Sequence, residues 1–146
     1  MDRTIAAVKA KIDALLEEKE SLIIAIDGKC TSGKTTLAGK LAQIYDCNVF
    51  HMDDFFLPPA LRTEDRLAVA GGNVHHERFA EEVLPKLRSR EAFSYRRFDC
   101  SRMDMDELRS VKASCFRVVE GSYSCHPYFQ DPYDLKVFLE VSSVVR

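Results

Sequence analysis

Apolar residues follow two different spacings along this chain. Near its start they recur every three or four positions and fall on one helical face, between charged residues: Ile5, Val8, Ile12, Leu15 and Leu16. We therefore expect an amphipathic helix over residues 2–19. Residues 22–26 form an unbroken apolar run rich in β-branched side chains, which is typical of a parallel strand buried on both faces. This run predicts the central strand of a sheet.

Segments of these two kinds alternate along the rest of the chain. Further helices are expected over residues 34–45 and 76–88, with a short one over 104–111. Further strands are expected over residues 47–52, 115–119 and 135–141, and residues 93–98 fit a strand or an extended connection. Strands that alternate with helices predict an α/β fold, a three-layer sandwich with a parallel sheet.

Residues 54–72 have the composition of a loop. Pro58-Pro59 and Gly71-Gly72 flank a short charged segment, residues 63–69, that fits one or two helical turns. We expect this loop to be mobile and to face a substrate.

A glycine-rich segment separates the expected central strand from the helix that follows. It has two glycines, then lysine, then threonine, at the spacing of a phosphate-binding loop (P-loop): Gly28, Lys29, Cys30, Thr31, Ser32, Gly33, Lys34, Thr35 and Thr36. Glycines let backbone N–H groups converge on phosphate oxygens, and the helix directs its positive dipole end at the same anion. Lys34 would reach the β- and γ-phosphates, and Thr35 would offer a hydroxyl to Mg²⁺. The alternative is a surface turn with a helix cap, but the flanking strand and helix favour nucleotide binding.

Composition limits the remaining possibilities. The chain has 146 residues, 46% of them hydrophobic, which suits one domain: an N-terminal helix over residues 1–20 and a P-loop core over residues 21–146. With 21 basic and 23 acidic residues, it has no broad positive surface for nucleic acid or an anionic membrane. The five cysteines show no Cys-x-x-Cys pair, and no secretory signal precedes them. We therefore expect free thiols and a cytoplasmic protein.

Several phrases in a fixed order resemble the uridine kinase family of P-loop nucleoside kinases, to which nicotinamide riboside kinases are related. They are residues 27–36, Met-Asp-Asp-Phe-Phe at 52–56, residues 71–85, Phe-Ser-Tyr-Arg at 93–96 and Val-Val-Glu-Gly-Ser-Tyr at 118–123. The resemblance implies an enzyme that uses ATP and Mg²⁺. It would transfer the γ-phosphate to a hydroxyl of a uridine- or cytidine-like nucleoside or a related sugar-containing acceptor.

The resemblance also implies roles for acidic residues at strand ends. Asp53 matches the catalytic base that takes the acceptor's proton, beside Lys34. Glu120 matches an acid that helps Thr35 hold Mg²⁺. Asp53 and Asp54 could instead only cap the loop, and Glu120 could only pair with Lys34 in an empty site. Asp27 is a further acid beside the P-loop.

Acceptor binding is expected from residues spread over four segments: Asp53, His75, Tyr95, Arg97 and Tyr123. His75 stands where the family has an acid that binds sugar hydroxyls. Cys100 lies near where a uridine kinase has a base-contacting histidine, so the acceptor can differ from uridine. The arginines around position 97 fit either an anionic acceptor or a solvated patch.

The family continues beyond the fourth strand into an arginine-bearing lid helix and a fifth strand, and this sequence stops at Arg146. The expectation is a core without the lid and last strand, which binds nucleotide and turns over slowly. Two alternatives stay open: a non-catalytic ATP-binding module and an NTP hydrolase. The expected partner is a small-molecule phosphate acceptor, and homo-oligomerisation is left open.

Overall fold

A computed structural model describes residues 2–28, 33–69, 72–99, 102–122, 124–125 and 132–139. The helices are α1 (Asp2–Glu18), α2 (Lys34–Ile44), α3 (Glu64–Ala68), α4 (His76–Glu82) and α5 (Leu84–Leu87). The strands are β1 (Leu22–Gly28), β2 (Asn48–His51), β3 (Phe93–Asp99), β4 (Asp104–Val111), β5 (Phe116–Glu120) and β6 (Leu135–Leu139). Two 3₁₀ turns, Met52–Phe55 and Pro59–Leu61, follow β2.

Four of the strands form a parallel sheet in the order β2-β5-β1-β6. β1 is an inner strand, as the apolar run predicted, with Ile24 opposite Val118 of β5 and Leu135 of β6. Since all four strands run the same way, their carboxyl ends lie at one edge of the sheet. That edge carries Gly28, His51 and Glu120, the last residues of β1, β2 and β5.

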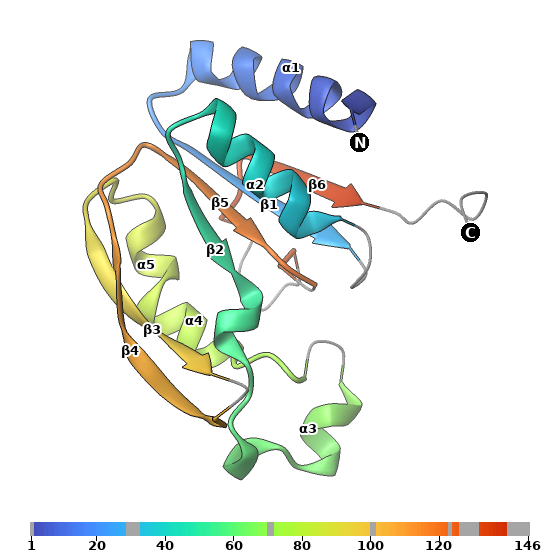
Figure 1. Ribbon diagram of the computed structural model, residues 1–146, viewed down its shortest axis with the longest axis vertical. Helices are drawn as coiled ribbons and strands as arrows, with labels where there is room; N and C mark the ends of the chain where they lie inside the picture. Colours follow the sequence, from blue (N-terminus) through green and yellow to red (C-terminus); the bar gives the residue numbers. More distant parts are fainter. Residues whose placement is uncertain are drawn as a thin grey trace, which may run out of the picture.

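Side chains of β1 alternate between two buried layers, which gives the three-layer arrangement in Figure 1. Leu22, Ile24 and Ile26 pack with residues of α1, α2 and β5. Ile23 and Ala25 pack on the opposite face with α4, α5, the Met52–Phe55 turn and the β3–β4 hairpin. The expected fold class is therefore confirmed.

Two expected helices differ from the structure. Residues 104–111 form strand β4, which pairs antiparallel with β3 in a separate two-stranded sheet. Backbone pairing with a strand earlier in the chain outweighs the helix propensity of Glu107-Leu108-Arg109. The expected helix over residues 76–88 is broken at Val83 into α4 and α5, because Pro85 has no N–H to continue the α4 ladder.

The long connection between β2 and α4 contains the two 3₁₀ turns and the short helix α3, which lies within residues 63–69, where one or two helical turns were expected. Arg66 of α3 bonds this connection to α4: its guanidinium donates two hydrogen bonds to Glu77 of α4, at 2.6 and 2.7 Å. It also donates to the carbonyls of Gly72 and Val74. None of the helices in this part of the chain, or elsewhere among the described residues, has the length and apolar character needed to cross a bilayer.

Candidate active site

The two glycines of the P-loop have unusual backbone angles. Gly28 has φ 151° and Gly33, which precedes α2, has φ 93°, a region that side chains with a Cβ rarely adopt. Lys34 is the first residue of α2 and is buried, with 7% of its surface exposed. Lys29, Cys30, Thr31 and Ser32, which were expected to bind nucleotide, lie outside the described residues. Thr35 and Thr36 are exposed in the first turn of α2.

Glu120 is an acid bonded to this helix end. Its side chain is buried at the carboxyl end of β5, where Thr35 Oγ1 donates a hydrogen bond to Oε2 at 3.2 Å. His51 Nδ1 also contacts Oε2, from the carboxyl end of β2. His51 and Glu120 are register partners on neighbouring parallel strands, so their side chains lie side by side. One carboxylate oxygen thus joins the helix end to the edge of the sheet.

Several nearby acids affect the pKa of the His51 imidazole. Its hydrogen bond to Glu120 raises the pKa of His51, and the charges of Glu120, Asp54 and Asp53 raise it further, while burial opposes them. The Met52–Phe55 turn lies beside the end of β5, since a Cβ on Gly121, the residue after Glu120, would lie 2.4 Å from Met52 Cβ. His51 was not among the site residues expected from the sequence. The available signal was its place as the last residue of a short strand, directly before the acidic turn.

Asp53 and Asp54 are adjacent in the chain but differ in surroundings. Asp53 is exposed, whereas Asp54 is 8% exposed and accepts a hydrogen bond from the Tyr95 hydroxyl to Oδ2 at 2.9 Å. Burial and the nearby Asp54 carboxylate raise the pKa of Tyr95. The structure therefore joins Tyr95, an expected acceptor ligand, to Asp54. Asp53 is left facing solvent, where an acceptor can reach it.

Arg78 supports this turn from α4. It is buried, donates to the carbonyl of Asp54 at 2.8 Å and to the carbonyl of Arg96, and its guanidinium lies 4.3 Å from the centre of the Phe55 ring. Burial lowers the pKa of Arg78. Arg78 was not expected from the sequence, because a lone arginine on a helix usually lies in solvent. It connects α4, β3 and the acidic turn.

His75, a second expected acceptor ligand, lies next to the same turn. Its backbone N–H donates to the Phe55 carbonyl at 2.6 Å, and residues 56 and 74 form an isolated antiparallel bridge. Its buried Nδ1 atom has no hydrogen-bond partner among the described residues. Burial and the charge of Arg78 lower the pKa of His75, so the ring is neutral at neutral pH. A neutral imidazole can donate or accept a hydrogen bond.

The two remaining expected acceptor ligands are Arg97 and Tyr123. Arg97 Nη2 donates to Asp106 Oδ2 at 2.8 Å, across the hairpin, and lies 3.8 Å from Asp99. This hydrogen bond to Asp106 raises the pKa of Arg97. Its charge is thus already balanced by two acids. Tyr123 lies outside the described residues, as does Cys100, and the roles of all these residues remain predictions.

Asp27 holds the two loops of the site together. Its Oδ1 accepts a hydrogen bond from the Gly28 N–H at 2.6 Å and its Oδ2 one from the Cys125 N–H at 3.1 Å. Ser122 Oγ donates to the Gly28 carbonyl at 2.8 Å, and Ser124 Oγ donates to the Ile26 carbonyl at 3.1 Å. The segment after Glu120 is therefore bonded along the start of the P-loop.

The oxygen donors at this edge suit Mg²⁺ bound together with phosphates. The hydroxyl of Thr35 and the carboxylate of Glu120 are two hard ligands that already lie within hydrogen-bond distance. Among the described residues, no group of three or more histidine, cysteine, aspartate or glutamate side chains could hold a metal by itself. Mg²⁺ usually takes one or two protein oxygens and fills its other positions with phosphates and water. The residues present fit that mode of binding.

Known proteins resemble this chain in structure. Its sequence matches neither a protein-family model nor a curated protein. A structure described as a possible uridine kinase from Bacillus stearothermophilus has a TM-score of 0.73 at 22% identity, over 94% of this chain and 84% of that one. One described as a fructose transport system kinase from Silicibacter sp. TM1040 has a TM-score of 0.69 at 26% identity, over 91% of this chain and 74% of that one. These likenesses confirm a P-loop kinase fold and, at the level of fold, the resemblance to uridine kinases.

Proposed function

We propose that this chain is an ATP-dependent phosphotransferase that moves the γ-phosphate of ATP to a hydroxyl of a small, sugar-containing acceptor. One observation carries the proposal: the Thr35 hydroxyl, at the start of the P-loop helix, is bonded to the buried Glu120 carboxylate, and an exposed aspartate follows the neighbouring strand. A Mg²⁺ ligand pair beside a P-loop and a carboxylate facing solvent are the parts that phosphoryl transfer needs.

Each residue has a task that follows from its position. Lys34 and the N–H groups at the start of α2 bind the phosphates of ATP and attract their negative charge. Thr35 and Glu120 would hold Mg²⁺, which would neutralise charge on the phosphates of ATP. Asp53 orients the acceptor hydroxyl and takes its proton as the hydroxyl oxygen attacks the γ-phosphorus and ADP leaves. Asp54, bonded to Tyr95, fixes the turn on which Asp53 lies.

His51 positions the Glu120 carboxylate. In the structure the His51 ring and the Thr35 hydroxyl both contact Oε2 of Glu120. We assign His51 the task of orienting this carboxylate beside Thr35, the other residue that would hold the metal. Partners of this kind commonly orient a ligating carboxylate.

The acceptor is expected to carry sugar hydroxyls. Asp53 lies in the Met52–Phe55 turn, the His75 N–H is bonded to the carbonyl at the end of that turn, and both side chains can bond to hydroxyl groups. The two similar structures are described as a possible uridine kinase and a fructose transport system kinase. Uridine and fructose share only their sugar hydroxyls, which is the chemistry that we carry over to this chain. Either a nucleoside or a free sugar fits it.

Mass spectrometry of reaction mixtures tests the proposal. The protein is incubated with ATP and Mg²⁺ and a panel of uridine, cytidine, nicotinamide riboside, fructose and pantothenate. We expect one acceptor class to gain a phosphoryl group. A protein that binds ATP but phosphorylates no acceptor would be a binding module, and one that releases ADP at the same rate with and without acceptors would be an NTP hydrolase. Either result contradicts the proposal.

A variant of the P-loop lysine serves as the control for nucleotide binding. Lys34→Ala should abolish the rise in melting temperature that ATP and Mg²⁺ give the unchanged protein, because it removes the cation that meets the phosphates. Thermal stabilisation by ATP that survives this change would place the nucleotide elsewhere in the molecule.

A further inference from the structure

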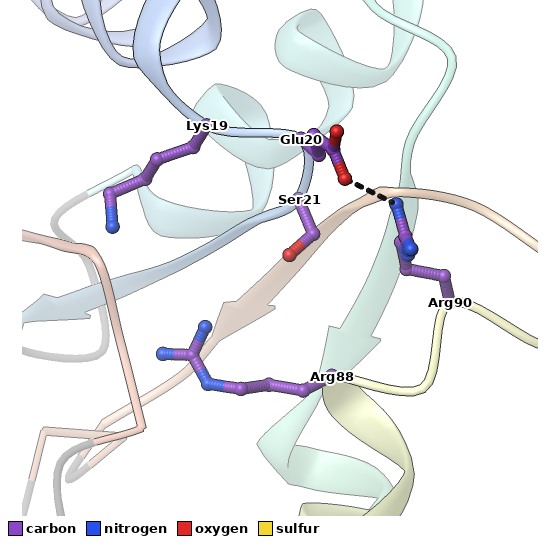
Figure 2. A pocket seen from close by; sticks show the side chains of 5 residues that line it. All are labelled: Lys19, Glu20, Ser21, Arg88 and Arg90. Carbon is purple, nitrogen blue, oxygen red and sulfur yellow. Dashed lines mark ion pairs between the residues drawn. The ribbon is translucent and has the colours of Figure 1, made fainter.

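A polar cleft lies at the opposite edge of the sheet from the P-loop. It has a volume of about 380 Å³ and is lined by Lys19, Glu20, Ser21, Arg88 and Arg90. The first three of these residues connect α1 to β1, and the two arginines follow α5. In Figure 2 the polar ends of Lys19, Ser21 and Arg88 turn toward one space, and Arg90 lies to the side, paired with Glu20.

Positive charge exceeds negative charge in this cleft. Lys19 Nζ and Arg88 Nη2 both approach Asp134 Oδ1, at 3.3 and 3.4 Å. Arg90 lies 3.8 Å from Glu20, whose side chain is 92% exposed. Three cations thus face two carboxylates, in a chain whose formal net charge is −2. The cleft therefore has one excess positive charge, although the net charge of the whole chain is negative.

The carboxylate that Lys19 and Arg88 share has a structural task. Asp134 is 6% exposed at its side chain, and its Oδ2 accepts a hydrogen bond from the Ile23 N–H at 2.8 Å. The cations above it stay open to solvent, with exposed side-chain fractions of 44% for Lys19 and 56% for Arg88. They can therefore bind a further anion without leaving Asp134.

A buried arginine fixes the loop that carries Arg88 and Arg90. Arg117 of β5 is 1% exposed and donates to the carbonyls of Lys86 and Glu91, both at 2.6 Å. These two carbonyls bracket the loop. The Ser114 N–H donates to the Arg90 carbonyl at 3.0 Å from the other side. The cleft is therefore built before any ligand arrives, which lowers the entropy cost of binding.

We propose that this cleft is a second anion site, which binds the phosphate group of a small metabolite. A guanidinium group offers paired N–H donors that match phosphate oxygens, and an ammonium and a hydroxyl complete the set here. The cleft is larger than one phosphate ion and lies within the size range of small-molecule sites. A phosphate carried on a sugar would fill it better than inorganic phosphate does.

This site is separate from the proposed nucleotide site. Ser21 precedes β1 and Gly28 ends it, and a seven-residue strand spans about 20 Å. Binding at the cleft therefore neither needs nor blocks ATP binding. The inference stands whether or not the chain transfers phosphate.

Nuclear magnetic resonance of the ¹⁵N-labelled full chain gives the required local readout. The protein is titrated with glucose 6-phosphate, with inorganic phosphate, and with sodium chloride at matched ionic strength. We expect saturable shifts of the amide signals of residues 19–23 and 88–91 with both phosphates. Tighter binding of glucose 6-phosphate would identify an ester as the ligand, and equal binding would identify the free anion. Both outcomes support an anion site.

Charge-removing variants decide whether the cleft itself binds. Arg88→Gln and Lys19→Gln, on two different segments, should each weaken binding about tenfold, since each removes a charge-assisted hydrogen bond. Lys112→Gln is the control, because Lys112 is 65% exposed and pairs with Asp46 outside the cleft. Shifts confined to residues 33–36, shifts that chloride reproduces, or unchanged affinity in both cleft variants would overturn the proposal.

Discussion

Asp54 and Tyr95 form a buried pair that fixes the turn on which Asp53 lies. Removing the hydroxyl with Tyr95→Phe leaves the Asp54 carboxylate, 8% exposed, without this donor. We expect the free energy of unfolding to fall by about 1.5–3 kcal/mol, the usual range for a hydrogen bond to a charged group. Urea titration monitored by circular dichroism measures the change.

The matched control is a further buried tyrosine whose hydroxyl donates a hydrogen bond. Tyr133 donates to the neutral carbonyl of Ser124 at 2.7 Å, and Tyr133→Phe should cost only about 0.5–1.5 kcal/mol. If Tyr95→Phe costs no more than Tyr133→Phe, the Asp54 carboxylate does not depend on Tyr95.

The pair between Arg66 and Glu77 makes a pH-dependent prediction. The hydrogen bonds from Arg66 lower the pKa of Glu77 from its ordinary value of 4.5 to about 2. A lowered folded-state pKa stabilises the protein above the unfolded pKa, and the stabilisation is lost as the pH falls from about 4.5 to about 2. Because Glu77 is half exposed, solvent limits the contribution to about 1 kcal/mol at neutral pH.

Glu77→Gln, compared with the unchanged protein at several pH values, tests this pair. The difference in unfolding free energy should be largest near pH 7 and shrink steadily below about pH 4.5, as the wild-type carboxylate takes up its proton in the unfolded state. A difference that stays constant across this range would mean that the salt bridge contributes nothing and that only packing changed.

Individual site residues differed in how far the sequence could predict them. Lys34 and Thr35 stand at fixed offsets in one local motif, and Glu120 directly ends a buried strand. His51 and Arg78 act through contacts with residues 69 and 24 positions away in the chain, respectively. No local pattern carries that information, because the partners meet only after the sheet and α4 have packed.

At the scale of helices and strands, replacing two glycines with alanine should change the stability of the protein in opposite directions. Gly121 follows Glu120 with φ 144°, and a Cβ there would lie 2.4 Å from Met52 Cβ, at the start of the turn that bears Asp53. Gly121→Ala should cost about 1–3 kcal/mol of stability from strain and overpacking, and displace the turn. Thermal melts measure the loss of stability, and the rate of phosphoryl transfer detects the displaced turn.

Gly39 is the matched position without strain. It lies inside α2, and a Cβ there would meet nothing within 4 Å. Gly39→Ala should therefore stabilise the protein by about 0.5–1 kcal/mol, since alanine loses less backbone entropy in a helix. Destabilisation by Gly39→Ala, or tolerance of Gly121→Ala, would contradict the packing described for these two segments.

The elements that the sequence predicted best are those whose own apolar pattern decides their structure. The buried strands and α2 are of this kind, because burial on one or both faces repeats at a fixed period. β4 is mostly exposed, with Leu108 62% exposed, so its side chains carry little periodic signal. Its strand conformation comes from backbone pairing with β3, which the local sequence does not encode.

At the scale of the whole molecule, the parallel sheet separates two kinds of chemistry. The carboxyl edge gathers Lys34, Glu120 and the acidic turn, in the place where α/β sheets commonly bind ligands. The amino edge carries the basic cleft around Lys19 and Arg88. β1 runs between the two edges, as Figure 1 shows, and its register with β5 fixes the position of Glu120.

The most direct test of the proposed reaction is the rate at which phosphate passes from γ-³²P-labelled ATP to the acceptor in Asp53→Asn. Asparagine keeps the shape of the exposed side chain but cannot take a proton. We predict transfer about 10²- to 10⁴-fold slower than in the unchanged protein, with ATP-dependent thermal stabilisation retained. Transfer at the full rate by Asp53→Asn would contradict the assignment of Asp53 as the base.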